Sequence, residues 1–188
     1  MIDENAYGLL IAWFDIEDVE YSLETEQFVE RYSEFRATVM GCLDAMPLGQ
    51  NVRALDLGHA FYLELADGDE RTDPIRWLRD IRGQLNELEF SSLSVVCHGG
   101  RWVEGNGESE AFPREKVGDV TLVRASRPSE PLRKAIAAES AAHPSDDETP
   151  GWGPGIYVES EVIEALGRKL KNAPTALTAG DTSFYRVA

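Results

Sequence analysis

Two apolar stretches predict the centre of a β-sheet. The first, Tyr7–Ile16, is almost continuously apolar, which is typical of a strand buried on both faces. The second, Asn51–Leu65, has strand-forming residues on both sides of Leu57-Gly58-His59. Because glycine readily adopts the positive φ that closes a tight turn, this second stretch predicts an antiparallel hairpin with Gly58 at its tip.

Four other segments are predicted to be helices. Apolar residues recur at steps of three and four over roughly Glu24–Met46, which predicts a long amphipathic helix. Asp73 followed by Pro74 has the pattern of an N-cap and first helical residue, so a second helix is expected there. A third helix is expected over Pro131–Ala142, and a short one is expected to begin with Ser160 as its N-cap.

The remaining apolar runs are short and predict strands. They are Leu93–Gly100, Asp119–Val123, Gly155–Val158 and Ser183–Val187. Between the first strand and the long helix, Glu17–Glu20 is expected to be an acidic loop. The segment 145–155 is rich in proline, glycine and acid, so it is predicted to be a surface insertion.

The order of these elements predicts an α+β fold with a mixed or antiparallel sheet covered by helices. The chain has 188 residues, which suits one domain, 1–188, with a sizeable core. Its hydrophobic content of 43% fits a globular protein, and no apolar run is long enough to span a bilayer. The acidic N-terminus does not resemble a signal peptide.

The net charge of −16 limits the classes of partner. Such a charge repels nucleic-acid phosphate and anionic lipid, so neither nucleic acid nor a membrane is an expected partner. It also opposes binding of a nucleoside triphosphate unless cations neutralise the site. Cys42 and Cys97 lack metal-binding spacing, so they are expected to be buried and reduced, and the protein is expected to be cytoplasmic.

Four local patterns together resemble the catalytic domain of class III nucleotidyl cyclases, the adenylate and guanylate cyclase family. They are Trp13-Phe14-Asp15-Ile16, Leu57-Gly58-His59-Ala60-Phe61, Cys97-His98-Gly99-Gly100 and the late segment Gly155–Leu166. The shared order and spacing carry the resemblance, since no single pattern is specific. The resemblance implies a ferredoxin-like βααββαβ core and a homodimer or a heterodimer with another protein, with a nucleotide as the ligand.

The resemblance also implies two metal-binding positions, of which the chain keeps one. In this family two cations, Mg²⁺ or Mn²⁺, bridge two Asp side chains and the triphosphate during in-line displacement. Asp15 matches the first Asp, whereas His59 occupies the second position. A neutral imidazole brings no negative charge, and Mg²⁺ prefers oxygen ligands. Asp56 lies three residues before His59, so its side chain should face the other side of the strand.

Other family positions also depart from the pattern. The base-selecting Lys of the family corresponds to Leu55, which cannot hydrogen-bond a purine. The family's Asn and Arg, spaced N-x-x-x-R, have no counterpart in Gly118–Arg127. Arg124 or Arg127 would serve as the transition-state arginine only in a shifted register. The site is therefore interpreted as degenerate.

Each candidate residue also fits a structural role. Asp15 could cap a loop or pair with Arg53, and His59 fits a solvated turn residue. His98, before two glycines, fits a histidine that packs or hydrogen-bonds the backbone. Trp152, within the proline- and glycine-rich segment, is expected to be exposed and available for contacts.

Three hypotheses from different classes remain. The first is a catalytically degenerate cyclase-like domain that acts as a regulatory or a protein- or nucleotide-binding module. The second is an active but atypical Mn²⁺-dependent nucleotidyl cyclase that uses Asp15 and His59 to make a cyclic nucleotide. The third is an unrelated α+β adaptor with no connection to nucleotides.

Overall fold

The strand β1 (Ile2–Trp13) lies at the centre of the sheet in the computed structural model. The structure describes residues 2–45, 53–66, 73–103, 114–117, 120–123, 128–144, 150–167 and 175–188. β1 pairs antiparallel with β3 (Ala60–Ala66) on one side and with β4 (Ser92–Val103) on the other. Its residues from Ala6 to Trp13 are all buried, which confirms the expected strand with two buried faces. The strand begins at Ile2 and ends at Trp13, earlier at both ends than the predicted Tyr7–Ile16.

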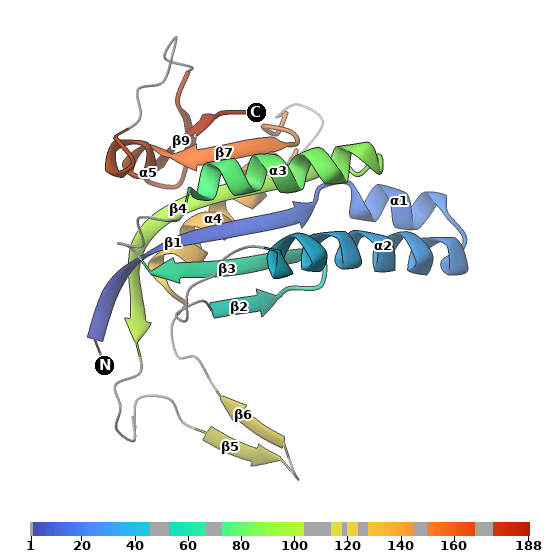
Figure 1. The fold of residues 1–188 in the computed structure, drawn as a ribbon, viewed down its shortest axis with the longest axis horizontal. Helices are drawn as coiled ribbons and strands as arrows, with labels where there is room; N and C mark the ends of the chain where they lie inside the picture. The colour runs from blue at the N-terminus through green and yellow to red at the C-terminus, as the bar shows by residue number, and fades with distance from the viewer. Residues whose placement is uncertain are drawn as a thin grey trace.

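The main sheet has seven strands in the order β2-β3-β1-β4-β7-β9-β8 (Figure 1). The outer strands are β2 (Arg53–Asp56), β7 (Gly155–Glu159), β8 (Leu177–Ala179) and β9 (Thr182–Arg186). The β4–β7 pair is parallel and the other pairs are antiparallel, so the sheet is mixed. The strands β5 (Arg114–Val117) and β6 (Val120–Val123) form a separate two-stranded sheet.

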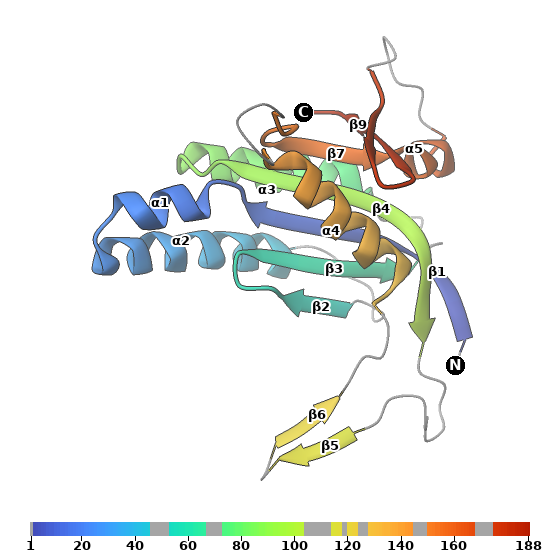
Figure 2. The same cartoon turned by 180° about the vertical axis from the view of Figure 1, so that it is seen from behind.

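Helices cover both faces of the main sheet. One face packs against α1 (Ile16–Ser22), α2 (Thr25–Asp44), α3 (Pro74–Glu87) and α5 (Ser160–Ala165). On the opposite face α4 (Glu130–Ala142) crosses the strands, as Figure 2 shows. The predicted hairpin is confirmed, with Gly58 at φ 82° between β2 and β3. Asp73 is confirmed as the N-cap of α3, because its side chain accepts a hydrogen bond from the Arg76 amide.

Three local expectations are corrected by the structure. Glu17–Glu20 is not a loop but part of α1, because Ile16 and Val19 lie one helical step apart and pack on the core. Ser160 is the first residue of α5, and Glu159 occupies the N-cap position. Trp152 is half-buried against Tyr157 and Phe184 and is not an exposed contact residue.

The last residues of the predicted insertion bind the end of α4. Residues 145–149 lie outside the described residues, but Trp152 and Gly153 donate backbone hydrogen bonds to Ala141 and Ala142 at the end of α4. These bonds satisfy carbonyls that the helix end leaves without partners. A side chain at Gly151 would come within 2.3 Å of the Ala142 carbonyl oxygen, so glycine is required there.

The predictions of fold class and of buried cysteines are confirmed. The chain folds as a mixed sheet with helices on both faces, and Cys42 and Cys97 are both free and buried. Burial raises the pKa of both thiols, which keeps them protonated. In the described part of the chain, every helix is too short or too polar to cross a membrane.

Candidate functional site

The first predicted metal position, Asp15, lies where β1 ends and α1 begins. It is the N-cap residue of α1, yet its side chain makes no capping hydrogen bond. Instead the indole Nε1 of Trp13, a buried residue, donates to Asp15 Oδ1 over 2.9 Å. The first turn of α1 then adds the carboxylates of Glu17 and Asp18. Asp15 is therefore oriented by the core in a locally negative environment.

The second predicted position, His59, lies at the same end of the sheet. The Trp13 amide donates to the His59 carbonyl over 3.0 Å, which holds the hairpin tip beside the end of β1. The His59 side chain points toward α4, where Nε2 lies 2.6 Å from Glu139 Oε1. The Glu139 side chain is only 14% exposed, against 42% for His59, so the contact is half-shielded from solvent. His59 is thus already engaged within the chain.

Sequence reasoning missed Glu139, which lies 80 residues after His59. The helical spacing could have indicated this residue. Glu139 follows the buried Ala135 by four residues, so it lies on the same side of α4. An acid beside the inward face of a predicted helix needs a partner. The sequence did not show which strand would supply that partner.

Asp56 faces the opposite side of the hairpin, as its odd offset from His59 predicts. Both of its carboxylate oxygens accept hydrogen bonds from the Arg36 guanidinium of α2, and Oδ1 also accepts from the Gly58 amide at 2.9 Å. The Arg36 bonds, followed by the Gly58 bond, lower the pKa of Asp56 to about 2. Tyr32 adds a hydrogen bond to the Gly58 carbonyl. Asp56 therefore joins the hairpin to α2, whereas His59 contacts α4.

The remaining predicted positions add no polar group to this region. Leu55 is 44% exposed on β2 and offers only a hydrocarbon side chain. Arg124 and Arg127 lie outside the described residues, so their role stays a prediction. His98 packs its ring against Tyr7 with centroids 5.2 Å apart, in agreement with the structural role considered for it.

Asp15 and His59 alone do not fit a two-metal centre. Two divalent cations need several oxygen ligands, mostly carboxylates. Here one carboxylate is joined by an imidazole that a glutamate already holds. Over the described ranges, the His, Cys, Asp and Glu side chains form no group of three or more that could hold a metal ion. A metal role for Asp15 and His59 stays a prediction.

A second polar cluster joins α4 to β4 and β7. Lys134 Nζ donates to Glu159 Oε1 and to the His98 carbonyl, each over 2.7 Å, and the His98 amide donates to Glu159 Oε2 over 2.7 Å. The Glu159 side chain is 3% exposed. Burial alone would lower the pKa of Lys134, but its bonds and charge interactions with Glu159 and Glu130 outweigh burial and raise that pKa. The groups satisfy one another, which is typical of a structural contact.

Comparison with known proteins gives matches in structure alone. No family model matches the chain, and a search of curated proteins found no match. A bacterial light-regulated adenylyl cyclase matches with a TM-score of 0.61 at 8% identity, over 100% of this chain and 92% of that one. The adenylyl cyclase CyaB from P. aeruginosa matches at 0.51 and 8% identity, over 100% and 95%.

A fungal domain matches as well. It is the non-canonical dimeric guanylyl cyclase domain of the RhoGC fusion protein from Blastocladiella emersonii, with a TM-score of 0.53 at 10% identity over 98% of this chain and 94% of that one. At such identities the likeness concerns the fold. The chain has the fold of class III nucleotidyl cyclase domains over its whole length, which confirms that part of the resemblance.

Proposed function

We propose that this chain, which has the class III cyclase fold, is a catalytically degenerate cyclase-like domain that acts as a regulatory module binding a protein or a nucleotide. The observation that carries the proposal is the contact between His59 and Glu139. At the position where the resemblance implies a second metal-binding Asp, the chain has a histidine, and that histidine is held by a neighbouring carboxylate.

Charge supports the same proposal. Two-metal catalysis works because cations neutralise the triphosphate while the new bond forms. Around Asp15 the chain places Glu17 and Asp18 on the first turn of α1, which repel phosphate. Leu55 supplies no group to select a base. A nucleotide that binds this domain would therefore be held weakly and in a pose unlike that of a substrate.

A specific observation favours the second candidate, an atypical Mn²⁺-dependent cyclase. Asp15 uses one oxygen for Trp13 and keeps other lone pairs for a cation. Mn²⁺ accepts both carboxylate and imidazole ligands. Activity would then require His59 to leave Glu139. The third candidate is an unrelated adaptor. It would require that the chain shares the cyclase fold over its whole length without any connection to nucleotides.

The fold also supports proposals about assembly. The Blastocladiella domain is described as dimeric, and a guanylate cyclase domain from Catenaria anguillulae was solved in complex with GTP. By analogy, we propose that this chain forms a homodimer or a heterodimer and that a nucleotide is its regulatory ligand. A cytoplasmic location is proposed on the two free, buried cysteines, which fit a reducing compartment.

Manganese binding tests the degenerate site. Electron paramagnetic resonance of Mn²⁺ mixed with the protein and ATP should show only weak binding, equal in the wild type and in Asp15→Ala. His59→Ala is measured in the same way, since it removes the other predicted ligand. Stoichiometric Mn²⁺ binding that both substitutions abolish would favour the atypical cyclase. The melting temperature of each variant would show that it remains folded.

A further inference from the structure

The α1–α2 corner, residues 15–34, forms the free end of the helical layer. None of the α1 residues is buried, although Ile16 and Val19 touch the core. On its last turn Tyr21 is 89% exposed, the highest exposure among the large exposed hydrophobic side chains of the described chain. A tyrosine offers a large apolar surface at small entropic cost, so an exposed tyrosine suits a contact residue. Among the described residues, no side-chain hydrogen bond or ring contact involves Tyr21.

A hollow lies along the start of α2, where its first lining residue, Leu23, follows Tyr21 by two positions. Its volume is about 600 Å³, and it is lined by Leu23, Gln27, Glu30, Arg31 and Glu34. Arg31 fixes one side of the hollow, because its guanidinium lies 4.0 Å from the Phe90 ring centroid and donates to the Leu88 carbonyl over 2.9 Å. Glu34 pairs with the same guanidinium over 2.6 Å. Four of the five side chains that line the hollow are polar or charged, so the hollow suits a polar or cationic side chain from outside.

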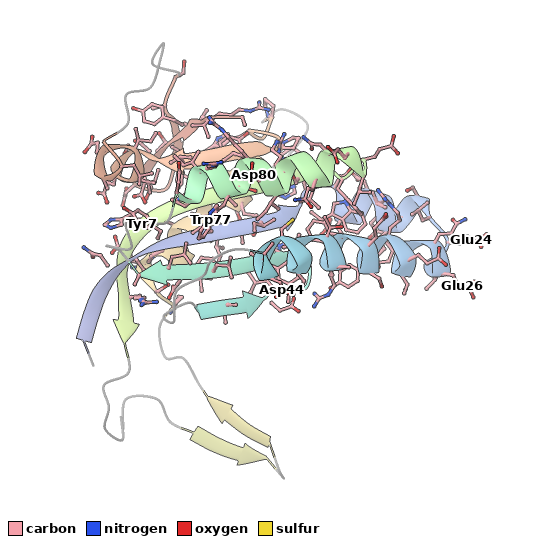
Figure 3. All side chains as sticks on the ribbon, in the orientation of Figure 1. Tyr7, Glu24, Glu26, Asp44, Trp77 and Asp80 are labelled. Carbon is pink, nitrogen blue, oxygen red and sulfur yellow. The ribbon has the colours of Figure 1, made fainter. Side chains whose placement is uncertain are left out.

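Apart from Arg31, the charged side chains of this corner are acidic. From Asp15 to Glu30 the sequence has seven acidic residues and no basic residue. Figure 3 shows Glu24 and Glu26 at the far end of the corner, away from the sheet. Within the described ranges, no Lys, Arg or His forms an ion pair with Glu17, Asp18 or Glu30. The corner thus combines the exposed aromatic side chain of Tyr21 with a mostly polar hollow, and it is bordered by carboxylates. Glu34 pairs with Arg31, whereas the others just named have no ion pair within the described residues.

We propose that the α1–α2 corner is a docking site for a basic, amphipathic segment of a partner protein. An apolar side chain of the partner packs against the exposed ring of Tyr21, and its Lys or Arg side chains face the hollow and the carboxylates of α1 and the start of α2. Charge complementarity selects this occupant, because an acidic segment or a nucleic acid would be repelled. The inference rests on the proposed role as a binding module and names the chemistry of its partner.

The test uses a helical peptide of about 16 residues, with Leu on one face and Lys on the other. Its affinity for the full chain is measured by fluorescence anisotropy, and backbone amide shifts are mapped by NMR. We expect the shifts to cluster in residues 15–34. The substitution Tyr21→Ala should weaken binding about tenfold, as expected for loss of a central aromatic contact. Because Tyr21 is exposed, this variant should melt like the wild type.

A matched pair of charge variants separates the corner from the net charge of −16. Glu26→Lys with Glu30→Lys changes the corner, while Glu164→Lys with Asp181→Lys makes the same charge change at exposed sites elsewhere. The first pair should weaken binding about tenfold or more and the second about twofold or less. Equal losses would mean that only the overall charge attracts the peptide, which overturns the proposal.

Two other outcomes also overturn it: no binding of the peptide at low salt, or amide shifts that lie outside the corner. The same peptide with Glu in place of Lys should not bind. These results are separate from catalysis. A protein that makes a cyclic nucleotide contradicts the proposed function whatever the peptide does, whereas a silent protein that ignores the peptide contradicts only this docking site.

Discussion

Asp56 and His59 show how one turn directs two polar side chains to opposite faces of a sheet. Asp56 reaches α2 through Arg36, and His59 reaches α4 through Glu139. The opposite directions could be predicted from the odd offset between the two residues, although Asp56 ends β2 and His59 lies in the turn, so no single strand carries both. The identities of Arg36 and Glu139 could not be predicted, because they depend on which helix covers each face.

The pKa of Asp56 should depend on the presence of Arg36. In the folded chain this pKa is lowered to about 2, chiefly by Arg36 and then by the Gly58 amide. A carboxylate whose pKa falls on folding stabilises the fold above its unfolded pKa of about 3.9. That stability should be lost as the pH falls from about 4 to about 2.

Carboxyl NMR titration measures this effect directly. The substitution Arg36→Leu should return the pKa of Asp56 toward its ordinary value and remove the acid-dependent part of the stability. Asp56→Asn identifies the resonance. A pKa that is ordinary in the wild type, or unchanged by Arg36→Leu, would contradict the bidentate contact.

The His59–Glu139 contact should be measurable as a coupling energy. A double-mutant cycle with His59→Asn and Glu139→Gln should give about 0.5–1 kcal/mol in urea unfolding, since the pair is half-exposed. A coupling energy of zero would contradict the contact and would mean that His59 is free for another ligand.

Among the elements, α4 packs closely against the sheet. Its buried residues are small: Pro131, Ala135, Ala138 and Ala142. Opposite its first turns the strands have glycine, and a side chain at Gly8 or Gly99 would collide with Pro131 or Glu130. The close approach brings Lys134 within reach of Glu159 and the His98 carbonyl. The small residues therefore make the polar contacts of α4 possible.

Gly8→Ala should destabilise the chain by about 2 kcal/mol, because the new Cβ would lie 2.6 Å from Pro131 Cβ and from the Tyr62 hydroxyl. The matched control is Gly83→Ala in α3, where nothing lies within 4 Å. That change should stabilise the chain by about 0.5–1 kcal/mol, since alanine favours helix. Urea unfolding of both variants checks the prediction. Similar effects of the two substitutions would contradict the close packing of α4.

Helices and strands with a clear apolar period were predictable, whereas α1 and β8 were not. The predicted ranges of α2 and α4 differ from the observed ones by one or two residues. α1 is short and strongly acidic, and only its contact with the core reveals Ile16 and Val19 as helical neighbours. β8 has three residues and depends on pairing with β9. Such elements are decided by tertiary contacts, which local sequence does not encode.

For the whole molecule, the sequence indicated the fold through four ordered patterns, and the structural matches agree with it. The site was harder to predict, since its meaning depends on pairs far apart in sequence. Trp13 with Asp15 could be suspected locally, but Glu139 with His59 could not. Arg124 and Arg127 lie outside the described residues, so a role for either as the transition-state arginine stays a prediction.

The central claim is the absence of cyclase activity, and product analysis tests it most directly. The purified protein is incubated separately with ATP, GTP, CTP and UTP, each with Mn²⁺ and with Mg²⁺, and cyclic product is sought by mass spectrometry. We predict no cyclic product from any nucleotide, at a protein concentration where the chain is folded and any dimer can form. A cyclic product that Asp15→Ala abolishes without unfolding the chain would contradict the account and establish an atypical cyclase.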